Sequence, residues 1–348
     1  MKWVNKKKVN YDRLEELLSE SENLNQFSND GPMIKKLESR LHELLKLDDN
    51  KTIILTNSGT SALHAIASVL KYITSRDLTF VTQAFTFPAS CQGSLSNSKI
   101  VDIDTNNMYG PDLLDINPDD IDGVIVTNIF GYICNIRYYI DWCNEHNKYL
   151  IFDNAATPYS FIDNKNILNY GTASIISFHH TKPIGFGEGG AIIIDNKYRD
   201  LVWSICNFGK NIDKNINWDR SSSNYKMSDI SAGFIYMLLD DFNHIVNHHQ
   251  KMYKYYYNKI KDKDQIYPTL DQNIFVSSLI YICKNKDISK KIMDDMKTNN
   301  IECKKYYSPL IDYHVSSSLY SKIICIPCNI DMNYQDIDLV VDIIEKND

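Results

Sequence analysis

The feature of this sequence that most constrains its fold is an alternation of short apolar runs with helical patterns. Apolar runs lie at 52–55, 79–82, 100–103, 124–127, 149–152, 174–178 and 191–195. Amphipathic helical patterns at 61–73 and 138–146 separate some of them. Short β-rich runs that alternate with helices are typical of a mostly parallel sheet with helices on both faces. We therefore predict an α/β fold built on a doubly wound central sheet.

The regions on either side of this alternation predict further elements. Before it, leucines at helical spacing indicate two amphipathic helices, at Tyr11–Ser21 and Met33–Leu45. After it, we expect a long helix at Ile230–Tyr257, strand-like runs at 275–282, 301–307 and 322–326, a basic helix, and a closing helix at Gln335–Glu345.

The length of 348 residues suits a large domain and a smaller one rather than a single core. We assign residues 31–240 to a large α/β domain and 241–348 to a small α+β domain. Residues 1–30 are expected to pack on the small domain or at a dimer interface.

Composition narrows the class of partner. The formal net charge is −7, and lysines and arginines are scattered rather than massed on one segment. The one short basic run, Lys6–Lys8, is interpreted as a solvated tail. This balance argues against a nucleic-acid or anionic-membrane surface as the main partner. No stretch approaches the ~20 apolar residues of a membrane span, and the N-terminus lacks the apolar core of a secretory signal.

The eight cysteines show no pattern of paired short spacings. Cys325 and Cys328 form the one CxxC, which lies in an apolar run and has no second pair. Core packing is therefore favoured over a redox or zinc site. We expect no metal and a reducing, cytoplasmic setting.

Residues 177–190 carry the strongest chemical signal. An apolar strand ends at Ser177, Lys182 follows, and four of the thirteen glycines come just beyond it. These glycines spell GxGxxG, but a dinucleotide site needs a helix after them. Here they lead into the apolar run 191–195, so we predict a tight hairpin instead.

Other strand ends supply groups that suit pyridoxal 5′-phosphate (PLP). This cofactor needs a lysine, an anion for its pyridinium nitrogen, a phosphate cradle and a group that covers the ring. Asp153 ends one strand, and Gly59, Thr60 and Ser61 begin a helix whose N-terminus can bind phosphate. Phe87 follows another strand. Each signal alone is weak, but open α/β sheets place ligands at such strand ends.

Together these segments resemble the DegT/DnrJ/StrS family of sugar aminotransferases, which have the fold of aspartate aminotransferase (fold type I). The likeness runs nearly end to end. It is carried by the segments 29–32, 59–63, 85–89, 130–131, 153–156, 177–182, 187–190, 224–229, 306–310 and 331–332.

The resemblance implies specific roles. Lys182 would hold PLP as a Schiff base and move the proton, Asp153 would pair with the pyridinium nitrogen, and Phe87 would cover the ring. Gly59, Thr60, Ser61 and Ser177 would hold the phosphate, and Asn224 would join them from the other subunit of a homodimer. Expected substrate contacts are Asn29, Gly31, Pro32, Phe85, His180, Glu188 and Tyr307.

Two positions depart from the family pattern. Many members carry Gln or His at the place of Ala156, where the side chain bonds the phenolic oxygen of the cofactor. Either Thr157, Asn154 or a water replaces that contact, or the contact is absent. Lys226 stands where an arginine is familiar, which puts a bidentate anion contact in doubt.

The implied reaction moves an amino group from L-glutamate, through pyridoxamine 5′-phosphate, to a ketone on a nucleotide-linked sugar. Relatives that act at the third sugar carbon more often have Asp where this chain has Glu188. We therefore favour conversion of dTDP-4-keto-6-deoxy-D-glucose to dTDP-4-amino-4,6-dideoxy-D-glucose. A 3-keto sugar aminotransferase, a GDP-perosamine-type synthase and an enzyme that acts on a UDP-linked hexose stay open. A sugar 3-dehydratase, which has His in place of the lysine, and a non-catalytic regulatory relative are less favoured.

Overall fold

The computed structural model describes residues 1–212, 218–261, 267–269, 271 and 274–348. Its centre is a seven-stranded sheet in the order β1-β11-β10-β7-β6-β2-β3. The strands are β1 (Lys51–Thr56), β2 (Phe80–Gln83), β3 (Lys99–Val101), β6 (Gly123–Thr127), β7 (Tyr149–Asp153), β10 (Ala173–Ser177) and β11 (Gly190–Asp195). β11 is antiparallel to both of its neighbours, whereas the pairs from β10 to β3 are parallel. The predicted α/β fold is confirmed.

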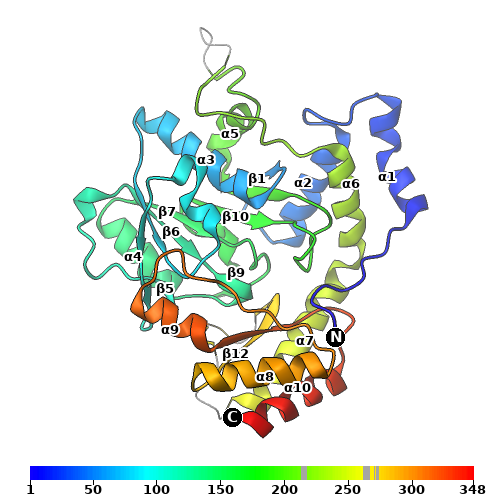
Figure 1. Ribbon diagram of the computed structural model, residues 1–348. Coiled ribbons are helices and arrows are strands. Elements are labelled where there is room, and N and C mark those ends of the chain that lie inside the picture. The colour runs from blue at the N-terminus through cyan, green and yellow to red at the C-terminus, as the bar shows by residue number, and fades with distance from the viewer. Residues whose placement is uncertain (213–217, 262–266, 270, 272–273) are drawn as a thin grey trace.

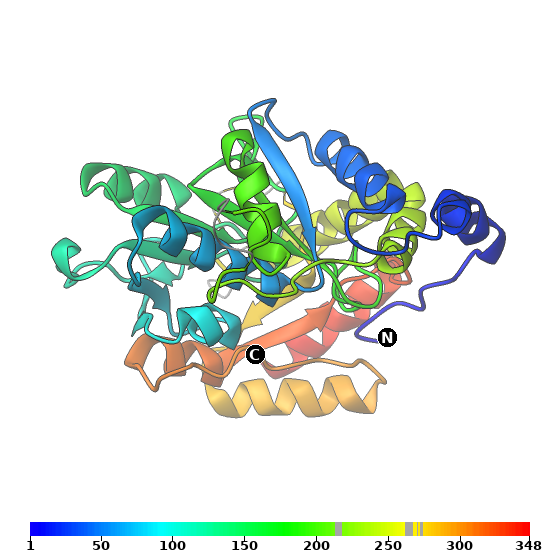
Figure 2. The same ribbon diagram turned by 90° about the horizontal axis from the view of Figure 1, so that it is seen from above.

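Helices cover both faces of this sheet because successive residues of each strand point in opposite directions. Ile54, Ile175 and Ile192 pack on one face with α3 (Gly59–Thr74) and α5 (Arg199–Cys206). Their neighbours in sequence face α2 (Pro32–Leu44) and α6 (Asp229–Leu238), while α4 (Ile136–Glu145) packs on β6 and β7. α1 (Tyr11–Asn23) lies against α2 and α6 at the outside (Figures 1 and 2).

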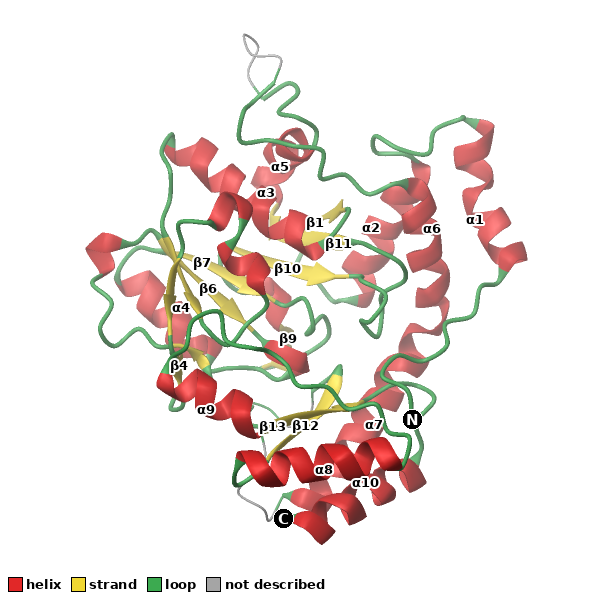
Figure 3. Cartoon of the chain, in the orientation of Figure 1, coloured by secondary structure: helices red, strands yellow, loops and turns green. Residues whose placement is uncertain are grey.

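A second unit lies below the sheet in the view of Figure 3. It contains the antiparallel pair β12 (Ser278–Ile282) and β13 (Ile323–Pro327) together with α7 (Phe242–Ile260), α8 (Lys286–Thr298), α9 (His314–Lys322) and α10 (Tyr334–Asn347). Two short pairs complete the strands, β4 (Ile103–Asp104) with β5 (Gly110–Pro111) and β8 (Phe161–Ile162) with β9 (Lys165–Asn166). Among the helices that the structure describes, none combines the length and apolar character needed to cross a membrane.

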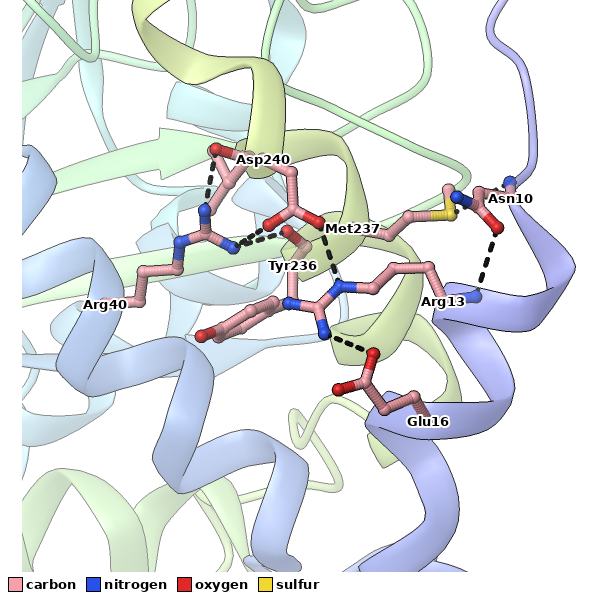
Figure 4. Close-up of polar contacts among 8 residues, drawn as sticks. Asn10, Arg13, Glu16, Arg40, Tyr236, Met237 and Asp240 are labelled. Carbon is pink, nitrogen blue, oxygen red and sulfur yellow. Dashed lines mark hydrogen bonds and ion pairs between the residues drawn. The ribbon is translucent and has the colours of Figure 1, made fainter.

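The predicted long helix at 230–257 is wrong, because α6 and α7 are separated by a 3-10 turn at Leu239–Asp241. Arg40 of α2 contacts the chain at this break. Its guanidinium donates to the carbonyl of Tyr236 in α6 at 2.9 Å (Figure 4). It also donates to the carbonyl of Leu239, just after α6, at 3.0 Å. A tertiary contact thus accompanies the end of a helix that the local apolar pattern would allow to continue.

Three further expectations differ from the structure. The loop between β10 and β11 spans residues 178–189 and is therefore not a tight hairpin, although the two strands do pair antiparallel. Residues 301–307 do not form a strand but contribute one isolated bridge, from Lys304 to Cys325. The run at 275–282 joins its strand only from Ser278, because Ser277 N–H instead donates to the carbonyl of Phe130 at 2.7 Å.

Candidate active site

The site lies where the parallel strands end. Thr127, Asp153 and Ser177 are the last residues of β6, β7 and β10, so their side chains gather at one edge of the sheet. A cavity of about 530 Å³ opens there. It is lined by Trp3, Ser58, Gly59, Thr60, Leu63, Phe87, Ala89, Thr127, Asn128, Ile129, Phe130, Asp153, Ala155, Ala156, Ile175, Ser177, His179, Thr181, Lys182, Glu188, Ser277, Tyr306 and Tyr307. A cavity of this size suits a cofactor with a small substrate portion.

Lys182 reaches this cavity from the loop 178–189. Its backbone N–H donates to the carbonyl of His179 at 2.8 Å, and its carbonyl accepts from Gly185 N–H at 3.0 Å, which forms a turn. Burial lowers the pKa of the Lys182 amine, and the carboxylate of Asp153 opposes that shift. A lysine that loses its proton more easily is a better nucleophile and base.

Asp153 is only 3% exposed. One carboxylate oxygen, Oδ1, accepts from Ala155 N–H at 3.0 Å. Burial raises the pKa of Asp153, while the Ala155 N–H and the charge of Lys182 act in the opposite direction. A buried carboxylate with so little compensation favours a cation close to it.

The N-terminus of α3 forms another wall. Ser58 caps this helix by accepting from Ser61 N–H at 3.0 Å, and Gly59 and Thr60 follow it at the cavity. A Cβ on Gly59 would lie 3.2 Å from the Cβ of Ser177, so glycine allows the helix end to approach β10. The first turn of a helix presents N–H groups without acceptors in the helix. This end of the cavity therefore suits a phosphate.

Aromatic rings line the opposite part of the cavity. Phe87 is 54% exposed and faces Tyr307 edge to face at 6.2 Å. Tyr307 stacks on Phe130 at 5.4 Å and on Tyr306 at 5.3 Å. Trp3 packs its edge against Tyr306 at 5.8 Å. These rings offer apolar faces to a flat ring and to a sugar.

Most of the predicted cofactor residues meet here. Gly59, Thr60, Phe87, Asp153, Ala156, Ser177 and Lys182 all line the cavity, and so do Glu188 and Tyr307 of the predicted substrate set. Ser61 does not line it, because its hydroxyl donates to Asn57 Oδ1 at 2.5 Å. Phe85 is fully buried behind the ring of Tyr307.

Other predicted residues lie outside this cavity. His180 is exposed and packs its ring against Phe186, whereas its neighbour His179 lines the site. Asn29, Gly31 and Pro32 lie at the start of α2, where Gly31 packs closely on the carboxylate of Asp229. Asn224 is exposed, and its backbone carbonyl accepts from Asn57 Nδ2 at 3.1 Å.

Sequence reasoning missed several lining residues. Trp3 comes from a segment that lacks a local signal. Phe130 lies in a segment that carries the family resemblance, but it was assigned no role, and the tertiary fold brings it to the cavity. The interpretation of Lys6–Lys8 as a solvated tail is wrong for Lys7. Its ammonium donates to the carbonyls of Lys182 (2.8 Å) and Gly185. An aromatic residue and a lysine so near the chain start could have been flagged only by proximity in space.

The residues present fit PLP. Asp153 supplies a buried anion for a pyridinium, α3 with Ser177 supplies a phosphate cradle, and Phe87 offers a ring face beside Lys182. Ala156 offers no polar atom for the phenolic oxygen, and the hydroxyl of neighbouring Thr157 is already donated to the Asn128 carbonyl at 2.8 Å. The described residues hold no group of three His, Cys, Asp or Glu side chains suited to a metal.

Known proteins are similar to this chain in sequence and in fold. A dTDP-4-amino-4,6-dideoxy-D-glucose transaminase of Shigella dysenteriae is 26% identical over 345 residues, which cover 92% of each chain. A GDP-perosamine synthase of Vibrio cholerae is 28% identical over 59% of this chain and 56% of its own. The crystal structure of a DegT/DnrJ/EryC1/StrS aminotransferase from Brucella abortus matches with a TM-score of 0.82 at 20% identity, covering 97% of this chain and 95% of that one.

The family profile described as the DegT/DnrJ/EryC1/StrS aminotransferase family matches residues 10–345. The match extends over both the sheet that bears Lys182 and the C-terminal unit that closes the cavity. The resemblance inferred from the sequence is thereby confirmed. This chain belongs to the DegT/DnrJ/EryC1/StrS aminotransferase family, and its cofactor is PLP, alternating with pyridoxamine 5′-phosphate.

Proposed function

We propose that this chain transfers an amino group from L-glutamate to the keto carbon of a nucleotide-linked keto-deoxy sugar. The observation that carries the proposal is the pairing of Lys182 and Asp153 in one cavity, in a chain of this family. The favoured substrate is dTDP-4-keto-6-deoxy-D-glucose, because the Shigella relative that covers 92% of the chain is named for the corresponding 4-amino sugar.

In the proposed reaction, the residues of the cavity have separate roles. Bound PLP supplies an electron sink for the carbon that gains or loses the amino group. The carboxylate of Asp153 would keep the pyridine nitrogen protonated, and Ser177 with the N-terminus of α3 would hold the phosphate. Lys182, whose pKa is lowered by burial, would hold the cofactor at Nζ and would carry a proton to or from the substrate carbon that bears the amino group. The rings of Phe87 and Tyr307 line the same cavity and would shield a bound cofactor from part of the solvent.

Three other substrates are alternatives. The first two are GDP- and UDP-linked sugars, because the Vibrio relative is named a GDP-perosamine synthase and a Campylobacter jejuni relative, 24% identical over 90% of this chain, is named a UDP-4-amino-4,6-dideoxy-N-acetyl-beta-L-altrosamine transaminase. A 3-keto sugar is the third alternative, which the glutamate at position 188 disfavours. Glu188 lines the cavity and lies 3.5 Å from His179 Nε2, so it is placed to contact the sugar.

We further propose that the active form is a homodimer in which Asn224 of each subunit reaches the phosphate of the other. The exposed amide of Asn224 supports this, because a free amide can donate to phosphate without adding charge. Mixed Lys182→Ala and Asn224→Ala chains should form heterodimers with one intact site and regain activity. If the mixture stays inactive, or if Asn224→Ala binds PLP normally, the shared site is wrong.

The substrate proposal is tested by a panel. The protein is loaded with PLP, given L-glutamate and incubated separately with dTDP-, GDP- and UDP-linked 4-keto sugars and with a 3-keto sugar. Mass spectrometry then identifies the products. We expect the mass of the amino sugar with the dTDP-linked 4-keto substrate, and no product from Lys182→Ala. Product only from a GDP, UDP or 3-keto substrate would replace the favoured substrate. Product from none of them, despite normal PLP binding, would contradict sugar amination.

A further inference from the structure

The first ten residues connect two distant parts of the molecule. The terminal ammonium of Met1 donates to the carbonyl of Asn300 at 2.6 Å, and the N–H of Trp3 donates to Glu302 Oε2 at 2.9 Å. The segment, dark blue in Figure 1, then runs from the C-terminal unit toward α1. It is therefore fixed on the C-terminal unit before it passes the loop that carries Lys182.

Lys7 makes the contact with that loop. Its Nζ donates to the carbonyl of Lys182 at 2.8 Å and to the carbonyl of Gly185. The Lys182 carbonyl also accepts from Gly185 N–H. One amine thus holds both ends of the turn that begins with the lysine of the active site.

This turn has little room to adjust. A Cβ on Gly185 would lie 2.2 Å from the carbonyl oxygen of His179, so the backbone on either side of Lys182 is closely packed. The N–H of Lys182 itself is bound to that same carbonyl. A shift of the carbonyls at 182 and 185 would consequently move the Lys182 side chain relative to the cavity.

We propose that Lys7 is a positioning residue, which fixes the turn 182–185 so that the Lys182 amine points to the cofactor. The inference rests on the proposed function only in that Lys182 carries PLP. Burial lowers the pKa of Lys7 to about 7. A neutral amine still has two N–H groups to donate, so both hydrogen bonds survive the loss of the proton. Lys7 therefore acts through geometry rather than through its charge.

The test compares three variants of the full chain. Lys7→Met keeps most of the aliphatic stem and removes the donors, Lys7→Arg keeps donors, and Lys8→Met alters an exposed neighbour as the control. Two readouts avoid the sugar reaction altogether. The first is amide hydrogen exchange of residues 178–189 in the protein without cofactor. The second is the rate at which added PLP is captured on Lys182, trapped by borohydride and located by mass spectrometry.

We expect Lys7→Met to speed exchange in this loop and to slow PLP capture roughly 10- to 100-fold, the scale of a misplaced reacting group. Lys7→Arg, which keeps hydrogen-bond donors at this position, should restore part of the capture rate, and Lys8→Met should match wild type. Wild-type capture by Lys7→Met would overturn the proposal. The proposal would also be overturned if the capture rate of Lys7→Met fell only in proportion to its melting temperature and Lys7→Arg did not restore that rate. If PLP is captured on another lysine, the assignment of Lys182 fails instead, which separates the two claims.

Discussion

Two groups of charged side chains in this molecule have opposite surroundings. At the end of the sheet, Lys182 and Asp153 lie in a cavity with few polar partners, and burial disfavours the charge on each. At the outer edge, Asp240 receives Arg40 at 2.7 Å on one oxygen and Arg13 at 3.0 Å on the other (Figure 4). We call Arg13, Arg40 and Asp240 the arginine cluster. It joins α1, α2 and the end of α6.

This difference in surroundings predicts that the cavity residues serve activity and the arginine cluster serves stability. In the arginine cluster every charge is paired, and Arg40 also covers the ring of Tyr236 at 4.2 Å. Hydrogen bonds from Arg13 and Arg40 outweigh the effect of burial and lower the pKa of Asp240. In the cavity the charges lack such compensation until a cofactor binds. Residues of the cavity should therefore govern activity with little effect on folding, and residues of the cluster the reverse.

The largest effect is expected from Lys182→Ala. Removal of the nucleophile should lower kcat at least about 10⁴-fold, as for other covalent catalysts. The melting temperature of the cofactor-free protein should not fall, because the variant removes an amine whose charged form burial disfavours. Turnover assays and thermal unfolding measure both. A large loss of stability would contradict the contrast between the two regions.

Asp153→Asn should give the next largest loss of activity, at least about 100-fold, because a neutral amide does not keep the pyridine nitrogen protonated. The stability of the cofactor-free protein at neutral pH should stay the same or rise. The reason is the raised pKa of Asp153, which means that its ionised form is unfavourable in the folded state above that pKa. Near-normal turnover would place the required anion elsewhere.

Asp240→Asn should show the reverse pattern, with wild-type turnover and a loss of roughly 1 kcal/mol in the free energy of unfolding, since both ion pairs are partly exposed. The pKa of Asp240 is lowered on folding, so its contribution is present above the unfolded pKa near ~3.9 and is lost as pH falls below it. Denaturant titrations at pH 7 and at about pH 3 should show the difference from wild type shrinking in acid. A difference that persists in acid would mean that the effect is not ionic.

Glu16→Ala should have the smallest effect, within about 0.5 kcal/mol of wild type. Glu16 pairs with Arg13 at 2.7 Å, but its side chain is 70% exposed and Arg13 keeps its contact with Asp240. The same denaturant titration provides the comparison. A loss as large as that of Asp240→Asn would show that the cluster extends further along α1 than its geometry indicates.

The sheet and the chemical centre could be predicted from the sequence for local reasons. Alternating apolar runs mark strands, and Asp153, Ser177 and Gly59 stand at strand or helix ends, where parallel strands converge. The break after α6 could not be predicted, because the local apolar pattern continues through it and the contact that Arg40 makes there comes from a segment about 200 residues earlier. Trp3 and Lys7 were missed for the same reason. The contacts that define their roles are made with residues 306 and 182–185, and local patterns do not record contacts over such separations.

Of the residues assigned a role by the family resemblance alone, only some line the cavity. Glu188 and Tyr307 line the cavity, whereas Asn29, Gly31, Pro32 and Asn224 lie outside the cavity of their own chain. Their roles as substrate or phosphate contacts stay predictions. These roles can be tested in a homodimer, where a residue of one subunit could reach the site of the other.

The central claim is that Lys182 carries the cofactor, and one measurement addresses it directly. The wild-type protein is loaded with PLP, reduced with borohydride, digested and sequenced by mass spectrometry to locate the modified lysine. The account predicts one phosphopyridoxyl group per chain, on Lys182, because among the lysines that the structure describes this amine combines entry to the cavity with a pKa lowered by burial beside Asp153. Modification of Lys7, Lys226 or any other lysine in its place would contradict the account.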